Sequence, residues 1–161
     1  MNKFPFEFKG KSGKTYTITK MGFKQLWSNF IETSPKNLES IKDKENYIYF
    51  DTPNMFSENE DIIYCAFFED LVVSHVQYDP SMNMLLTAST HKLFRNDTLA
   101  TNLIEIAIKD IPQNTIYLTE YSKEGETYLH PTLKLLSLKT SKTLLQYDKE
   151  LGYPVDIMNN K

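Results

Sequence analysis

The sequence predicts an α/β domain, in which helices flank a central mixed β-sheet. Two apolar runs, 62–68 and 71–78, meet at Glu69 and Asp70, which is the pattern of an antiparallel hairpin. A polar run and then an amphipathic segment over 99–111 predict a helix that buries one face. The strand expected next, over 114–121, is apolar on both faces, which is typical of a central strand with a parallel neighbour.

The first half of the chain is expected to alternate between short strands and helices. The β-branched run 14–19 predicts a strand, and the apolar spacing within 21–33 predicts a helix. Ser34 before Pro35 marks the start of a second short helix over 34–43. Residues 46–51 are either a short strand or extended chain. After the hairpin, the turn residues of 79–83 lead into a third strand over 84–90.

The last forty residues allow two interpretations. In the first, 141–153 is a helix, capped by Ser141 and ended by Gly152, with Leu144, Tyr147 and Leu151 on successive turns. In the second, the last helix covers 131–138 and 142–147 is a strand. Residues 130–139 are compatible with either type of element. No repeat or long linker interrupts the chain, so we expect one domain over residues 1–161.

Composition narrows the class of protein. The net charge of −3 gives no reason to expect nucleic-acid binding, and the basic residues do not cluster beyond Lys9, Lys11 and Lys14. No signal-peptide pattern and no segment long enough to span a membrane is visible, and the single cysteine cannot form an internal disulfide. We therefore expect a cytoplasmic protein. Cys65 lies in an apolar run, so we expect a buried, inert thiol rather than a nucleophile.

Several familiar motifs are missing. The run GKSGKT at 10–15 ends like a phosphate-binding loop, but Phe8 stands where the first glycine belongs and a strand follows. Residues 23–124 contain no glycine, which excludes a dinucleotide fingerprint or a Gly-x-Ser-x-Gly elbow there. The three histidines have no metal-ligand spacing, so no metal site is expected, and His75 is expected to be a sheet residue.

The start of the helix at 99–111 is the candidate binding site. Helix N-termini carry unpaired N–H groups that bind anions, here near residues 97–101, and Arg95 could add a charge-assisted contact. The apolar stripe of this helix consists of Leu99, Ala100, Leu103, Ile104, Ile106 and Ala107. A helix that is only structural, with a capped N-terminus, is the alternative.

The run HKLFRNDTLATNLIEIAI, with a strand on each side, resembles the cofactor-binding core of the GNAT acetyltransferase superfamily. In that family an Arg/Gln-x-x-Gly-x-Gly/Ala turn opens the helix, and its amides hold the pyrophosphate of acetyl-CoA. Arg95 and Ala100 match the first and last positions, whereas Thr98 stands where glycine is usual. The order of elements over 14–121 is similar to the family's order. Asp97 is a good capping residue whose carboxylate could block the amides.

The resemblance implies an N-acyltransferase that moves an acetyl group from acetyl-CoA to a small-molecule or protein amine. The cofactor would contact Thr90, Arg95, Asn96, Asp97, Thr98, Leu99, Ala100 and Thr101. Glu120, at the end of its strand, would be the general base and Tyr147 the general acid. In the second interpretation of the C-terminal residues, no tyrosine stands where the acid should be. The alternative function is a GNAT-like domain without activity that works through protein contacts.

Overall fold

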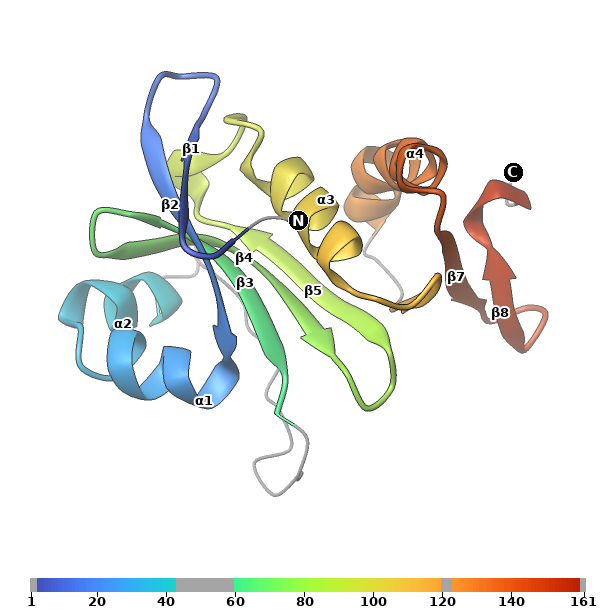
Figure 1. The fold of residues 1–161 in the computed structure, drawn as a ribbon, viewed down its shortest axis with the longest axis horizontal. Coiled ribbons are helices and arrows are strands. Elements are labelled where there is room, and N and C mark those ends of the chain that lie inside the picture. Colours follow the sequence, from blue (N-terminus) through green and yellow to red (C-terminus); the bar gives the residue numbers. More distant parts are fainter. Residues whose placement is uncertain (1–2, 43–59, 120–122, 160–161) are drawn as a thin grey trace.

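The computed structural model describes residues 3–42, 60–119 and 123–159 (Figure 1). These residues form one mixed sheet of eight strands, and the strands lie side by side in the order in which they occur in the chain. The strands are β1 (Phe6–Lys9), β2 (Thr15–Gly22), β3 (Ile62–Phe68), β4 (Leu71–Asp79), β5 (Met84–Thr90), β6 (Thr115–Leu118), β7 (Thr143–Asp148) and β8 (Tyr153–Asp156). The helices are α1 (Phe23–Leu26), the π-helix η1 (Trp27–Ile31), α2 (Pro35–Lys42), the 3₁₀-helix η2 (Lys92–Phe94), α3 (Leu99–Asp110), α4 (Lys123–Thr140) and the 3₁₀-helix η3 (Ile157–Asn159).

The connections between strands explain the direction of each pair. Strands β1 to β5 pair antiparallel, and so do β7 and β8. Strand β6 is parallel to β5 and to β7. This is because α3 and then α4 return the chain to the end of the sheet at which the preceding strand began, so that the next strand runs in the same direction. The expectation of a mixed α/β sheet with β6 parallel to a neighbour is therefore confirmed.

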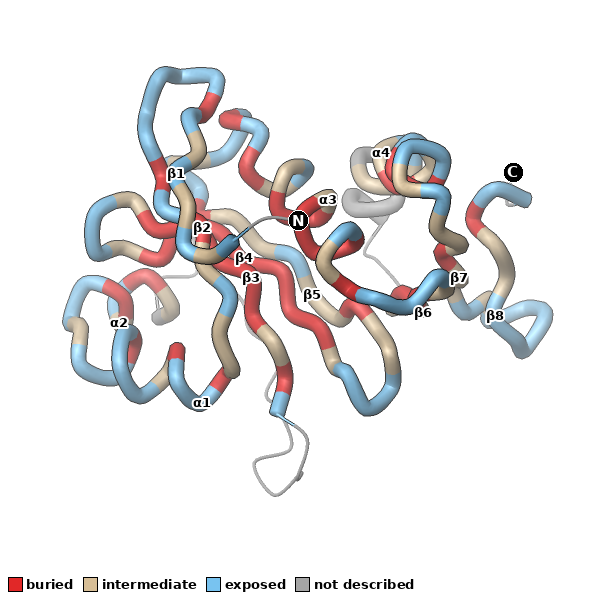
Figure 2. Tube along the Cα trace, in the orientation of Figure 1, coloured by how far each residue is buried: buried red, intermediate tan, exposed pale blue. Residues whose placement is uncertain are grey.

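Helices cover both faces of the sheet, and buried residues lie along β3, β4 and α3 (Figure 2). Each face has its own core. Strand β3 shows why: Ile63 and Cys65 pack beneath α1 and η1, whereas Tyr64 and Ala66 lie on the face of α3 and α4. Because side chains alternate along a strand, a strand buried on both faces is a continuous apolar run in the sequence. The larger core lies under α3 and includes all of that helix's buried side chains.

Most elements of the first half agree with the sequence. The strand over 14–19, the helix at 34–43 and the three-strand meander occur with small shifts in their ends, and Glu69 takes a positive φ of 54° in the hairpin turn. The helix expected over 21–33 is a short α-turn followed by a π-helix, in which Glu32 N–H donates to the Trp27 carbonyl. The GKSGKT run includes the β1–β2 turn, and β1 itself was not expected. Residues 46–51 lie outside the described part.

The helix expected over 141–153 is wrong, and the alternative with a strand at 142–147 is confirmed. Helix α4 already ends at Thr140, where Ser141 adopts a positive φ of 57°. Strand β7 follows at once and pairs with β6, so its residues satisfy a sheet edge that would otherwise be open. Gly152 does have a positive φ, but in the turn between β7 and β8 rather than at a helix end.

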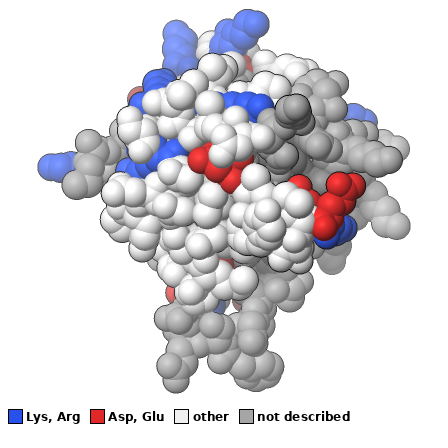
Figure 3. Space-filling view, turned by 90° about the vertical axis from the view of Figure 1, so that its right-hand side faces the viewer, with Lys and Arg blue, Asp and Glu red and all other residues white. Residues whose placement is uncertain are grey.

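The surface charge is unevenly distributed. Figure 3, which faces the right-hand side of Figure 1, shows basic side chains at the top of the molecule, at the height of the β1–β2 hairpin, and others at the left and near the centre of this face. Acidic side chains form two groups lower on the same face. Around the turn of the hairpin, the exposed lysines are Lys9, Lys11 and Lys14. In the part of the chain that the structure describes, no helix is long and apolar enough to cross a membrane.

Candidate functional site

The connection from β5 to α3 is a compact loop with two left-handed residues. His91 accepts a hydrogen bond at Nδ1 from the Leu93 N–H (3.2 Å), which caps the short helix η2. Asn96 and Thr98 then take positive φ values of 64° each. Such a conformation is tolerated by asparagine but is strained for a β-branched residue such as threonine. The loop therefore holds Thr98 in a geometry that suits the glycine expected from the resemblance.

The N-terminus of α3 carries no side-chain cap among the described residues. Thr98 is the N-cap residue, yet its hydroxyl donates backward to the Asp97 carbonyl (2.6 Å). The first N–H groups of a helix, here those of Leu99, Ala100 and Thr101, have no partner within the helix. Since Thr98 and Thr101 are both exposed, this end of the helix is accessible from solvent. The side-chain cap expected in the structural alternative is therefore absent from this helix.

The Asp97 carboxylate is turned away from the helix that it was expected to cap. It accepts hydrogen bonds from the Ser12 N–H (2.6 Å), the Ser12 hydroxyl (2.7 Å) and the Tyr16 hydroxyl (2.5 Å). These bonds, led by that of Tyr16, hold the pKa of Asp97 below its ordinary value. A Cβ on Gly10 would lie 2.3 Å from the Asp97 carboxylate, so only glycine fits there. The β1–β2 hairpin thus binds the carboxylate that could have blocked the amides.

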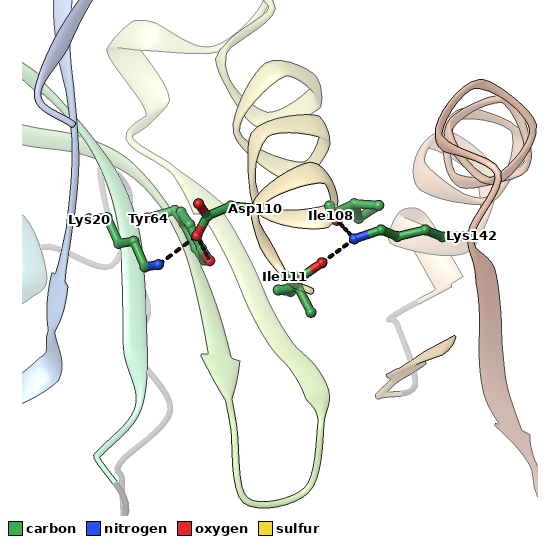
Figure 4. A network of polar contacts seen from close by, with 6 residues as sticks. All are labelled: Lys20, Tyr64, Ile108, Asp110, Ile111 and Lys142. Atoms are coloured by element: carbon green, nitrogen blue, oxygen red, sulfur yellow. Dashed lines mark hydrogen bonds and ion pairs between the residues drawn. The ribbon is translucent and has the colours of Figure 1, made fainter. Parts of the chain in front are cut away.

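Polar contacts fix the other end of α3 (Figure 4). The Asp110 carboxylate accepts from Lys20 Nζ (2.6 Å) and from the Tyr64 hydroxyl (2.7 Å), which ties the helix to β2 and β3. On the other side, Lys142 donates to the carbonyls of Ile108 and Ile111, where a cation also favours the helix dipole. These contacts set the direction in which the N-terminus of α3 points.

An apolar slot opens where β5 and β6 diverge. The two strands pair only at Met84–Leu85 and Tyr117–Leu118, after which β5 continues to Thr90. Thr119 closes the narrow end, because its N–H donates to the Leu85 carbonyl (3.2 Å) and its hydroxyl to that of Leu86 (2.6 Å). The slot has a volume of about 60 Å³, and its walls come from β4, β5, β6, α3 and α4: Val76, Leu85, Leu86, Thr87, Ala88, Ile104, Leu118, Thr119, Leu129 and Leu133.

The apolar slot and the N-terminus of α3 both lie along strand β5. From Leu86 to Thr90, β5 covers roughly 13 Å at the usual rise per residue. Thr90 lies at the helix end of this path, and its carbonyl accepts from Arg95 Nε (3.1 Å). Arg95 is exposed beside the N-terminus of α3, as the sequence suggested. The structure thus brings Thr90 and residues 95–101 together, but it places Thr90 away from the narrow end of the slot.

Of the two expected catalytic residues, the structure describes only Tyr147. Glu120 follows Thr119 in the chain and lies outside the described residues. Tyr147 lies in β7 and is 47% exposed. Because Leu144 is buried on the face of α3 and α4, Tyr147 lies on the opposite face. It does not line the slot, and its expected place in a helix over 141–153 is wrong.

Cys65 and His75 agree with their interpretation as structural residues. Cys65 is fully buried, and burial raises the pKa of its thiol to about 12. His75 is buried in the middle of β4. In the described ranges, no three His, Cys, Asp or Glu side chains form a group that could hold a metal ion. The role of Ser12 and Tyr16 was missed, because nothing local connects a hairpin to a residue more than eighty positions away.

No protein-family model matches the chain, and no curated protein matches it.

Proposed function

We propose that this chain is a GNAT-like N-acyltransferase that binds acetyl-CoA along β5 and transfers the acetyl group to an amine. One observation carries the proposal: the uncapped N-terminus of α3 and the apolar slot between β5 and β6 lie at the two ends of the same strand segment. An anion site joined to a narrow apolar slot suits a carrier with a pyrophosphate at one end and an acyl thioester at the other.

Each part of the carrier has a place in this arrangement. The pyrophosphate would accept hydrogen bonds from the N–H groups of Leu99, Ala100 and Thr101, with charge from Arg95. The pantetheine arm would extend along Leu86–Thr90. The slot's small volume of about 60 Å³ fits a two-carbon acyl group better than a long chain.

Direct transfer requires two proton movements. The nitrogen of the neutral amine attacks the thioester carbonyl and the C–N bond forms; the nitrogen then gives a proton to the base, the C–S bond breaks, and the departing thiolate takes a proton. Glu120 remains the proposed base, since Thr119, the residue before it, closes the narrow end of the slot. We assign no acid role to Tyr147, because it lies on the other face of the sheet. Solvent would protonate the thiolate.

A specific observation supports a second candidate. No described tyrosine lines the slot, and the residue expected to be the general acid lies elsewhere. A domain that retains the acyl-CoA geometry but not the chemistry, and acts through protein contacts, would show this pattern.

Calorimetry with acetyl-CoA and CoA tests the proposal. Ala88 lines the slot and is exposed, so Ala88→Trp should fill the slot and weaken acetyl-CoA binding by roughly tenfold or more, the effect of losing about 1.4 kcal/mol. Ala88→Ser is the matched control and should bind like the unmodified chain. Thiol release with a panel of amines then separates the two candidates. Binding with turnover supports the enzyme, and binding without turnover supports the second candidate. No binding at millimolar acetyl-CoA refutes the enzyme and leaves protein contacts as the function to test.

A further inference from the structure

A second cavity adjoins the N-terminus of α3. It lies between the β1–β2 turn and the loop before α3, and it has a volume of about 270 Å³. We call it the hairpin notch and define it by Lys11, Lys14 and Arg95, which line it together with Asn96 and Asp97. Asn96 and Asp97 directly precede Thr98, the N-cap residue of α3. The notch is therefore lined by the residues that come directly before the proposed pyrophosphate site in the chain.

The charge of the hairpin notch is positive. Lys11, Lys14 and Arg95 are all exposed side chains, whereas Asp97 is the only acidic residue in its lining. The Asp97 oxygens already accept bonds from Ser12 and Tyr16. Its carboxylate is thus held toward the protein, while the three cations border open space. An anion that entered the notch would meet an excess of positive charge over negative.

The position of the notch indicates which anion it would take. A pyrophosphate on the N–H groups of α3 has two substituents, and the slot lies in the direction of β5. The other substituent, the nucleoside end of the carrier, would then lie toward the β1–β2 hairpin. In CoA the ribose at this end carries a 3′-phosphate. Dephospho-CoA has the ribose without this phosphate, and phosphopantetheine has no ribose. Lysines and arginine are the side chains that bind such a group.

We infer that the hairpin notch binds the ribose 3′-phosphate of CoA, so that the chain selects acyl-CoA over thioester carriers without this phosphate. The inference rests on the proposed acyl-CoA function and specifies the carrier for the same site. It also gives the β1–β2 hairpin two roles, since Ser12 in its turn withdraws Asp97 from the amides while Lys11 and Lys14 supply the cations.

The test compares three ligands by calorimetry on the full chain at fixed ionic strength: CoA, dephospho-CoA and 4′-phosphopantetheine. CoA should bind tighter than dephospho-CoA by roughly tenfold or more, as expected for the loss of charge-assisted contacts. In the double variant Lys11→Ala/Lys14→Ala, this ratio should fall toward one. The matched control is Lys9→Ala/Lys36→Ala, which removes the same charge from two exposed lysines outside the notch. It should keep the ratio of the unmodified chain.

The possible results separate this inference from the proposed function. A CoA preference that the notch variant loses and the control keeps supports the inference. Equal affinities for CoA and dephospho-CoA overturn it and leave acyl-CoA binding intact. A preference that both double variants reduce equally also overturns it, because the effect would then come from overall charge. No binding of any of the three ligands refutes the proposed function itself, and the inference with it.

Discussion

Replacing Thr98 by glycine tests the strained loop at the head of α3. Thr98 has φ 64° and ψ 10°, a conformation that costs a residue with a Cβ roughly 1–2 kcal/mol. Glycine removes this strain, but it has more freedom in the unfolded chain, which costs about 0.5–1 kcal/mol. The Thr98 hydroxyl also donates to the Asp97 carbonyl, and its loss affects both glycine and alanine variants.

The informative comparison is therefore Thr98→Gly against Thr98→Ala, since both lose the hydroxyl and only alanine keeps the Cβ. We expect the glycine variant to be more stable than the alanine variant by about 1 kcal/mol. For a chain of this size, that corresponds to roughly 2–4 °C in Tm. Urea titrations followed by circular dichroism, together with thermal melts, measure the difference.

Thr101 provides the matched control, because it lies in the first turn of α3 with helical geometry and is also exposed. There the order should reverse, with alanine more stable than glycine by up to about 1 kcal/mol. If Thr98→Gly is no more stable than Thr98→Ala, the left-handed conformation of Thr98 is not strained and the reasoning fails.

The same pair of Thr98 variants also tests whether the N-terminus of α3 binds acetyl-CoA. Glycine at this position removes a Cβ next to the N–H groups of α3, so acetyl-CoA should bind tighter to Thr98→Gly than to Thr98→Ala. Calorimetry gives both affinities. Equal affinities would mean that the loop does not approach the carrier, which would count against the pyrophosphate site even if the stabilities behave as expected.

Three further predictions concern the support of the site. Asp110→Asn should destabilise the fold by about 1–2 kcal/mol in urea titrations, because Lys20 and Tyr64 lose a charged acceptor; an unchanged midpoint would remove Asp110 from the account of how α3 is anchored. Burial alone would raise the pKa of Asp110, but the bonds from Lys20 and Tyr64 hold it below its ordinary value, and the contact with Lys139 lowers the pKa of Glu105. A carboxyl group whose pKa is lower in the folded state than in the unfolded state stabilises the fold above its unfolded pKa of about 4 and loses this contribution as the pH falls through its folded pKa. The free energy of unfolding should therefore decrease below about pH 4. The decrease should be less steep in Asp110→Asn, which lacks one of these groups. Cys65 should not react with a thiol reagent at pH 8 until the chain unfolds, because the thiol is fully buried and its pKa is raised to about 12; rapid reaction of the folded protein would contradict this.

Part of the candidate site follows from local sequence. The polar run before an amphipathic segment marked the head of α3, and Arg95 lies there as expected. The direction of the Asp97 carboxylate did not follow, because an aspartate before a helix caps it unless another partner competes. That partner is the β1–β2 hairpin, whose Ser12 and Tyr16 come close only when the sheet has formed.

The sequence by itself determined the central meander, the helix α3 and the strand β6. Their signals are local: apolar runs of strand length, turn residues at Glu69 and Asn83, and apolar spacing of helical period. The tertiary structure decided the C-terminal residues. Ser141, Leu144, Tyr147 and Gly152 fit a helix by spacing, yet they belong to β7 and its flanking turns. The residues of β7 form a strand rather than a helix because they pair with β6, and a sheet edge offers backbone hydrogen bonds that no local pattern reveals.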